Sequence, residues 1–565
     1  MRQLKLLLMV AICFILVLTA CSSNSEKKDA AVESGAKAQE TSAASASQPA
    51  GSGINPPDTF PISDTPITMS AFAVQLPGVE DLKTNWFTQH LAEKLNIHFD
   101  WDISTDEGFK ERKQLELSSG DYPEIFLAGD FTKVEQMEYG AQGVLLPLND
   151  LIEQYAPNIK AAFDTIPYLK AAITVPDGNI YALPGVNQCF HCTRPAKMWI
   201  NTQWLDELGL EMPQTTEDFY QVLKAFKEKD PNKNNKADEI ALSGAASGWS
   251  RIDGFLMNAF IYNNMQDYFR VNNGKVEFVA LQPEWRDGLA YMNKLYKEDL
   301  IDPAAFTQPK DGLARLGQAA GDSILGAATS LHVGEFINNE SERWRQYRAL
   351  EPLVGPSGVQ LSTYDAGIGN SAFAITNKAK NPEAAIRLVD YLYTSEGTLF
   401  VTNGPEGELW RKAEPGEKDV RGNQAVWATK NSTHVTGNVQ NFHWRGMGPF
   451  IATFEFSESR VAPEDMYSID GYAKRLFVNT KELYEPHTPP LDAIYPKDVF
   501  ISQADVEEIS LMKPLITDYV ESNMVQFVTG KKSLDHDWDA YVKGFDNLNL
   551  ARYLEIHQNA LNTMQ

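Results

Sequence analysis

Oxygen-bearing side chains alternate along the segment DPNKNNKADEI. Alternation within a tight loop directs such oxygens at one point, and Ca²⁺ is a hard cation that takes about 6 to 8 oxygen ligands. The six candidate ligands are Asp230, Asn232, Asn234, the backbone carbonyl of Lys236, Asp238 and Glu239. The spacing therefore favours a structural calcium site, and the alternative is a solvated surface turn.

The same segment resembles the first part of an EF-hand loop, with two departures. The sixth position is Asn235 instead of Gly, and the twelfth is Ala241 instead of Glu. Asn tolerates the left-handed backbone that the sixth position needs. Glu239 could replace the missing bidentate carboxylate.

Two cysteines with a histidine between them lie in NQCFHCTRP. Cys189 and Cys192 have the CxxC spacing of zinc and redox sites, with His191 in between. A structural zinc site needs four ligands, and no second CxxC or HxxxH is present in the sequence. We expect a short local disulfide, with free thiols as the alternative.

The first 21 residues have the pattern of an export signal. Arg2 and Lys5 precede an apolar run over 6–18, and small residues lie directly before Cys21. The run is shorter than the roughly 17 to 25 residues of a membrane-spanning helix, which argues against an uncleaved anchor. The segment 18–21, LTAC, resembles the lipobox of bacterial lipoproteins, and this implies lipidation of Cys21 and cleavage before it. We therefore expect an extracytoplasmic protein that a lipid anchors to the cell membrane.

Composition divides the chain into a signal peptide at 1–20, a tether at 21–65 and a folded part. The tether is dominated by Ser, Ala, Gly and charged residues and has little apolar surface to bury, which predicts disorder. About 500 residues follow, more than one hydrophobic core usually supports. The sequence thus predicts at least two folded lobes.

Charge and motifs narrow the class of function. The formal net charge is −25, and an acidic surface repels phosphate backbones, so we expect no nucleic-acid partner. The sequence contains no GxxxxGK, HExxH or GxSxG. We expect no catalytic residues and no catalytic cofactor, although abundant carboxylates leave a glycosidase open.

Short apolar runs alternate with amphipathic stretches after residue 65, which predicts an α/β fold. Thr215 and Asp218 have capping-box spacing ahead of a buried stripe, and Asn381 with Pro382 begins another helix. Strands are expected at 124–128, 197–200 and 372–375.

Seven segments in register resemble family 1 extracellular solute-binding proteins of ABC importers. The resemblance covers about residue 65 to the C-terminus, and the maltose-binding and alginate-oligosaccharide-binding types look nearest. The segments are SGDYPEIFLAGD, GNIYALPG, MWINTQWLDELGLEMPQTTEDFYQVLKAF, LYKEDLIDPAAF, LEPLVGPSG, NSAFAITNKAKNPEAAIRLVDYLYTSEG and GFDNLNLARYLEIHQNAL. The oxygen-rich loop is also similar to the calcium loop of the alginate-oligosaccharide binders.

The resemblance implies a periplasmic-binding-protein-like fold with two α/β lobes and an interlobe ligand cleft. The implied first lobe is 66–183 plus 367–403, and the second is 184–366 plus 404–565 with insertions. Within the second range, the sequence leaves the lobe of the long extra stretch at about 404–501 open. The resemblance also implies a monomer that captures a carbohydrate, expected to be an oligosaccharide, and delivers it to permease subunits. A receptor for a peptide or another small solute, or a cell-surface glycosidase, is the alternative.

A sugar cleft needs aromatic faces for pyranose rings and planar polar groups for hydroxyls. Loop aromatics next to polar residues satisfy this description, and Asp130 matches a sugar-contacting position of the maltose-binding type. The expected ligand-binding residues are Trp86, Asp130, Asn187, Trp249, Arg251, Tyr364, Trp410, Trp444 and Arg445. Core packing is the alternative for each aromatic. The Trp-Arg pairs could also bind a carboxylated sugar.

Overall fold

The computed structural model describes residues 53–563, except for 77, 107, 366–367, 431–438, 498 and 500. The signal peptide, Cys21 and most of the tether lie outside the described residues. The last part of the tether prediction is wrong, because 53–65 packs on the fold. Ile62 is fully buried, and the Arg387 guanidinium donates hydrogen bonds to the carbonyls of Asn55, Pro56 and Thr59.

A mixed six-stranded sheet forms the centre of the first lobe, in the order β14-β4-β11-β3-β1-β2. The strands are β1 (Ile67–Gln75), β2 (Ile97–Thr105), β3 (Ile125–Phe126), β4 (Ala182–Asn187), β11 (Ile368–Ile375) and β14 (Phe450–Ala452). The helices are α1 (Trp86–Leu95), α2 (Phe109–Ser119), α3 (Lys133–Ala141), α4 (Asn149–Tyr155), α5 (Pro157–Thr165), α6 (Pro167–Ile173), α12 (Pro382–Leu392) and α13 (Ser395–Asn403). A hairpin of β12 (Trp410–Lys412) and β13 (Trp427–Thr429) follows α13.

A four-stranded sheet forms the centre of the second lobe, in the order β10-β5-β9-β6. The strands are β5 (Lys197–Asn201), β6 (Ile240–Ser243), β9 (Leu325–Ser330) and β10 (Tyr347–Leu350), with a separate hairpin of β7 (Phe269–Asn272) and β8 (Lys275–Phe278). The helices are α7 (Thr202–Leu208), α8 (Thr216–Glu228), α9 (Asp253–Leu256), α10 (Pro283–Lys297), α11 (Lys310–Gly317), α15 (Tyr472–Asn479), α16 (Gln503–Val528), α17 (Trp538–Gly544) and α18 (Leu550–Asn562). The helix α14 (Phe454–Glu458) lies between β14 and α15.

Short helical turns connect these elements. The turns of the second lobe and of the crossings are η1 (Phe190–Thr193), η2 (Gly248–Ser250), η3 (Met257–Ala259), η4 (Val279–Leu281), η5 (Pro303–Phe306), η6 (Val333–Glu335), η7 (Glu342–Arg345), η8 (Thr480–Tyr484), η9 (Glu485–His487), η10 (Leu491–Ala493) and η11 (Phe545–Leu548). Within the described part of the chain, no helix has both the length and the apolar character needed to cross a bilayer.

Several of these helices and strands form where their local sequence predicts them. The Thr215 hydroxyl accepts the backbone N–H of Asp218, whose carboxylate accepts the N–H of Thr215, so α8 begins with a capping box. Pro382 occupies the first turn of α12. In β1, Ala71 and Ala73 pack on one face of the sheet, and Phe72 and Val74 pack on the other.

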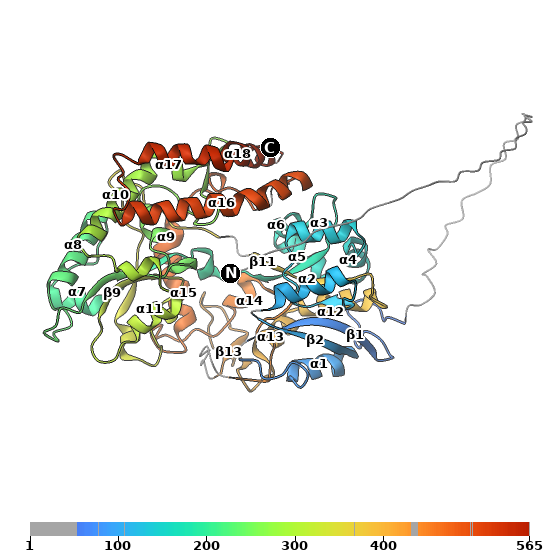
Figure 1. Cartoon of the computed structure of the whole chain (residues 1–565). Helices are drawn as coiled ribbons and strands as arrows, with labels where there is room; N and C mark the ends of the chain where they lie inside the picture. Colours follow the sequence, from blue (N-terminus) through green and yellow to red (C-terminus); the bar gives the residue numbers. More distant parts are fainter. Residues whose placement is uncertain are drawn as a thin grey trace, which may run out of the picture. The chain divides into compact units, whose positions relative to one another are not determined.

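Separate hydrophobic cores define the two lobes. One core gathers side chains around the second sheet together with the C-terminal helices, and another gathers side chains around the first sheet. This arrangement confirms the predicted two-lobe α/β class. Figure 1 shows α1 to α6 on one side of the molecule and α7, α8 and α10 on the other.

The chain crosses between the lobes three times. The crossings follow β4, precede β11 and follow β14. Backbones approach closely there: a Cβ atom on Gly369 would lie 2.3 Å from the carbonyl oxygen of Gly185, so only glycine fits.

The predicted second-lobe start at residue 404 is wrong. Phe450, Ile451 and Ala452 form β14, which pairs with β4 in the first sheet. The β12-β13 hairpin also packs against the first lobe, because Trp410 and Trp427 form a cluster with Leu399 of α13. The described residues of this stretch, 404–430 and 439–452, therefore extend the first lobe, and the third crossing follows them.

Candidate functional site

A pocket of about 730 Å³ lies where the crossing segments meet. Its walls come from the turn after β4, the segment before β11, α14, the β12-β13 extension and α15 with the turns that follow. The lining residues are Phe190, Thr193, Arg194, Tyr364, Arg421, Phe454, Glu458, Phe477, Lys481, Glu485, Thr488, Pro489, Pro490 and Leu491. Its volume is in the range of small-molecule sites, about 300 to 1,000 Å³.

The turn η1 presents Phe190 and Arg194 to this pocket. Cys189 and Cys192 form a disulfide across the turn, as expected, and the Cys192 N–H donates to the Cys189 carbonyl at 2.9 Å. The Thr193 hydroxyl donates to the Phe190 carbonyl at 2.6 Å. Because the sulfurs are bonded to each other, they are not the thiolates that a zinc site requires.

Aromatic rings form a large part of the pocket wall. The Phe190 ring lies 5.0 Å from Phe477 and 6.2 Å from Phe454, measured between centroids. The Arg194 guanidinium lies 5.6 Å from the Phe190 ring and 5.1 Å from the Tyr364 ring. Apolar faces next to hydrogen-bonding groups suit a ring that has one C–H face and several hydroxyls.

The charged groups of the pocket are partly paired with one another. Arg421 forms an ion pair with Glu458, and Lys481 forms one with Glu485. Burial raises the pKa of Glu458, although Arg421 opposes this shift. Arg194 donates instead to the hydroxyls of Thr488, at 3.0 Å, and Thr193, at 2.6 Å.

A buried lysine lies directly behind Arg194. Lys197, the first residue of β5, is fully buried and donates to the carbonyl of His191 at 2.6 Å and to that of Arg194. Burial, followed by the charge of Arg194, lowers the pKa of Lys197 to about 7. Burial also lowers the pKa of His191 well below its usual value. This end of the second sheet thus has an excess of basic groups.

Tyr364 is the one predicted ligand-binding residue among those that line this pocket. Trp249 is half-buried in η2, directly after β6. Asp130 is half-buried beyond β3 with a φ of 46°, and Asn187 is exposed at the end of β4. Arg445 is exposed with a φ of 55°. Whether these four residues contact a ligand stays a prediction.

The prediction that Trp410 and Trp444 are exposed in a cleft is wrong. Trp444 is fully buried in the first-lobe core, and its indole N–H donates to the Thr88 hydroxyl at 2.9 Å. Trp410 is 5% exposed, and its N–H donates to the Gly404 carbonyl. A buried ring whose N–H already has a partner cannot serve as a sugar platform.

Arg251 and Trp86 are also held by contacts within their own lobes. The Arg251 guanidinium is bidentate to the Asp253 carboxylate and pairs with Glu521. Burial opposes this charge, but the neighbouring carboxylates raise the pKa of Arg251 above its usual value. Trp86 stacks on His90, with centroids 5.0 Å apart, at the start of α1.

Most of the pocket residues were missed by sequence reasoning. Phe190 and Arg194 belong to NQCFHCTRP, a segment that was interpreted only for its cysteines. Its position directly after residue 183, where the first segment of the implied first lobe ends, could have identified it. Phe454, Phe477 and Thr488 lie far along the chain and carry no comparable local signal.

The oxygen-rich loop closes on itself between α8 and β6. The Asp230 carboxylate accepts the backbone N–H groups of Asn234 and Asn235, at 3.1 and 2.9 Å. The side-chain amides of Asn232 and Asn234 donate to Asp238. Lys233 and Asn235 have φ values of 57° and 58°, so the left-handed backbone expected at Asn235 is confirmed.

Glu239 supplies the observation that favours a cation at this loop. The carboxylate oxygens of Asp230, Asp238 and Glu239 do not all lie within 4.8 Å of one another, so these ligands are not gathered around one point in this structure. The Glu239 side chain is 4% exposed, and its Oε1 has no hydrogen-bond partner among the described residues. Burial, with the charges of Asp238 and Asp230, raises the pKa of Glu239. A divalent ion would satisfy the orphaned oxygen and screen the carboxylates from one another.

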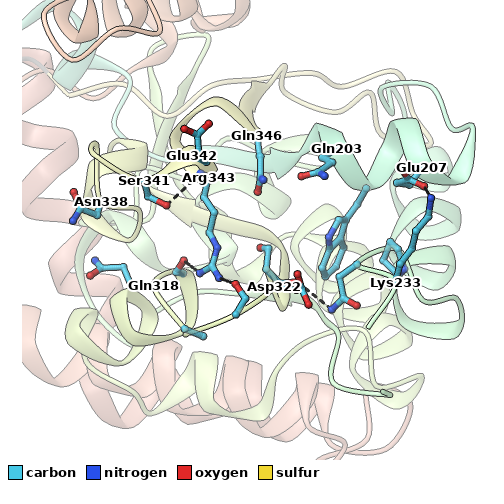
Figure 2. A pocket seen from close by; sticks show the side chains of 17 residues that line it. Gln203, Glu207, Lys233, Gln318, Asp322, Asn338, Ser341, Glu342, Arg343 and Gln346 are labelled. Atoms are coloured by element: carbon cyan, nitrogen blue, oxygen red, sulfur yellow. Dashed lines mark hydrogen bonds and ion pairs between the residues drawn. The ribbon is translucent and has the colours of Figure 1, made fainter. Parts of the chain in front are cut away.

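A second hollow of about 580 Å³ lies beside this loop, within the second lobe. Figure 2 shows Lys233 of the loop paired with Glu207, and the Arg343 guanidinium directed at backbone carbonyls. Asn232 lines the hollow and donates to the Ser323 carbonyl at 3.2 Å. The loop therefore forms part of the wall of this hollow and does not reach the pocket at the crossings.

Two α/β lobes with a ligand-sized pocket at their crossings define a two-lobe solute-binding protein. Residues 79–399 match the family model of the bacterial extracellular solute-binding proteins, and the chain belongs to this family.

Individual relatives agree with this assignment. FusA, the fructooligosaccharide ABC transporter substrate-binding protein of Streptococcus pneumoniae serotype 4, is 29% identical over 509 residues, 88% of this chain and 91% of FusA. Lipoprotein LipO of Bacillus subtilis is 30% identical over 206 residues, 35% of this chain and 37% of LipO.

Solved structures extend the similarity to three dimensions. The complex of FusA with kestose has a TM-score of 0.74 at 27% identity, and covers 88% of this chain and 99% of FusA. A FusA EF-hand mutant in complex with fructo-nystose is similar to the same degree. An HMO-binding, ABC-transporter-associated protein of Bifidobacterium longum infantis shares the fold, with a TM-score of 0.75 at 21% identity over 88% of this chain and 99% of that protein.

Proposed function

We propose that this protein captures an oligosaccharide outside the cytoplasm and delivers it to the permease subunits of an ABC importer. The observation that carries the proposal is the pocket at the crossings, whose lining combines four aromatic rings with hydrogen-bonding side chains. Closure of the lobes around the ligand removes water that competes for each hydroxyl. No bond is made or broken, and the protein acts as a monomer without a catalytic cofactor.

The names of the relatives support this substrate class. FusA handles fructooligosaccharides, and its solved complexes contain kestose and fructo-nystose. The similarity to FusA covers 88% of this chain and 91% of FusA, and is therefore not confined to one lobe.

A thermal-shift screen of the soluble chain from Ser22 onward, against a glycan library, tests the proposal. A ligand at about 100 times its Kd adds about 2.7 kcal/mol to the folded state and raises the melting temperature. Tyr364→Ala should weaken the binding of the responding glycan by about 1 to 2 kcal/mol, because the ring borders the pocket. Tyr122→Ala, a tyrosine outside the pocket, is the matched control. Stabilisation by peptides alone, or turnover of a glycan, would contradict the proposal.

The oxygen-rich loop holds a structural calcium ion in this proposal. Asp230, Asn232, Asn234, Asp238, Glu239 and the Lys236 carbonyl would be its ligands. The loop closure and the unpartnered Glu239 oxygen support the assignment. The known EF-hand mutant of FusA indicates that a relative has a loop of this kind.

The proposal also includes a lipid anchor on Cys21, supported by the lipobox and by a relative named as a lipoprotein. Cys21→Ser should abolish lipidation and release the protein from the membrane. Ligand affinity should stay unchanged, since more than 30 residues separate Cys21 from the first packed residue, Ile54. Cell fractionation and calorimetry measure the two properties. A variant that remains in the membrane fraction would show that the anchor is elsewhere.

A further inference from the structure

Charge in the pocket at the crossings is not balanced. Its lining includes three cationic side chains and two carboxylates. Arg421 pairs with Glu458, and Lys481 pairs with Glu485. Arg194 is the remaining cation, and no carboxylate oxygen of the described residues lies within 4.0 Å of its guanidinium.

The surroundings of Arg194 do not supply a counter-charge from behind. Lys197 is fully buried next to it, and its ammonium donates only to backbone carbonyls within the described part of the chain. The hydrogen-bond partners of Arg194 are two hydroxyls, from Thr193 and Thr488. The guanidinium is thus held in place by neutral groups and ring faces. Glu485 attracts its charge from beyond ion-pair distance, but this carboxylate is itself paired with Lys481.

A buried cation without a directly paired carboxylate is costly. Arg194 is 9% exposed, so water screens its charge poorly. An anion that enters the pocket would offset this desolvation cost by pairing with the guanidinium. A planar carboxylate matches the forked geometry of the guanidinium. The chain has a net charge of −25, so the rest of its surface would repel an anionic ligand. Capture of such a ligand would therefore depend on this one local cationic group.

We propose that Arg194 makes this pocket selective for oligosaccharides that carry a carboxylate, such as those built from uronic acids. This inference rests on the proposed carbohydrate function and specifies its substrate class. The rings of Phe190 and Tyr364, which both lie next to the guanidinium, would contact the C–H faces of the sugar. Its carboxylate would be bound by the Arg194 fork.

Calorimetry with matched pairs of ligands tests this selectivity. Each pair contains a uronate trisaccharide, from galacturonate, glucuronate, mannuronate or guluronate, and its carboxyl-reduced neutral counterpart. The acidic member of at least one pair should bind at least about tenfold more tightly at low salt. Since the difference comes from charge, it should shrink as sodium chloride is raised toward about 0.5 M.

Variants assign the difference to one side chain. Arg194→Gln should remove the preference, so that the acidic and the neutral member of each pair bind with affinities within about threefold of each other. Arg194→Lys should keep part of the preference, because it retains the charge without the fork. Arg315→Gln, which removes an exposed charge on α11, should change nothing. Melting curves without ligand confirm that each variant is folded.

The outcomes separate this inference from the proposed function. Neutral trisaccharides that bind as tightly as their acidic counterparts, without salt dependence, would overturn the selectivity and leave carbohydrate capture standing. A preference for acidic sugars that survives Arg194→Gln would also overturn it. A chain that binds no glycan of either kind in the wider library would overturn both.

Discussion

Replacement of Trp444 by alanine is expected to lower the free energy of unfolding by about 3 to 5 kcal/mol, the usual cost of removing a large buried aromatic side chain. Trp444 is fully buried, and the rings of Phe87, Phe99 and Trp101 surround it at centroid distances of 5.0, 6.1 and 5.8 Å. The change also removes the hydrogen bond from the indole to Thr88. Denaturant unfolding monitored by circular dichroism measures the effect.

Trp249→Ala is the matched comparison, because Trp249 is half-buried in a short turn. It should cost less than about half as much stability as Trp444→Ala. Glycan affinity of folded Trp444→Ala should equal that of the natural chain, since the ring does not line the pocket. An unchanged denaturation midpoint combined with a loss of glycan binding would show instead that Trp444 contacts the ligand.

Removal of divalent cations is expected to produce the second large effect. EDTA should lower the melting temperature, and calcium should restore it, with up to about 4 kcal/mol of stabilisation at 1,000 times the Kd. Without the ion, the Asp230, Asp238 and Glu239 carboxylates lie close enough to raise the pKa of Glu239. Magnesium should restore stability poorly, because it requires a smaller octahedral shell.

The response to EDTA distinguishes the stability that the metal supplies from the stability that the hydrogen bonds of the loop supply. Asp230→Ala also removes acceptors for the N–H groups of Asn234 and Asn235, so its own melting temperature should fall. The variant should no longer respond to EDTA, whereas Asp322→Ala, on the wall of the neighbouring hollow, should respond like the natural chain. Elemental analysis of the purified protein provides an independent measurement. A protein without calcium whose stability ignores EDTA would have an ordinary Asn-rich turn here.

Much of the fold was predictable because its signals are local. The capping box of Thr215 and Asp218 and the proline at the start of α12 depend on residues within one helical turn. The boundary at residue 404 was wrong for the opposite reason. The strand β14 pairs with β4, which lies more than 260 residues earlier in the chain. No sequence pattern near residue 450 predicts that pairing.

The ligand-binding residues were harder to predict than the loop. A tryptophan flanked by glycine or arginine has the same local sequence in a cleft as in a core. Trp444 is buried by Phe87 and Thr88, which come from the opposite end of the first lobe's sequence. Only the packed structure could therefore assign it to the core.

By itself, the sequence determined those properties that depend on neighbouring residues: the α/β class, the short disulfide and the spacing of the oxygen-rich loop. Tertiary structure alone decided which side chains form the pocket, because three separate crossings bring Phe190, Tyr364 and Phe454 together. It also decided the charge of that pocket. Arg421 and Lys481 find carboxylates when the chain folds, whereas Arg194 finds only hydroxyls and ring faces. Burial and pairing are properties of the folded chain, since both depend on contacts between segments that are remote in sequence.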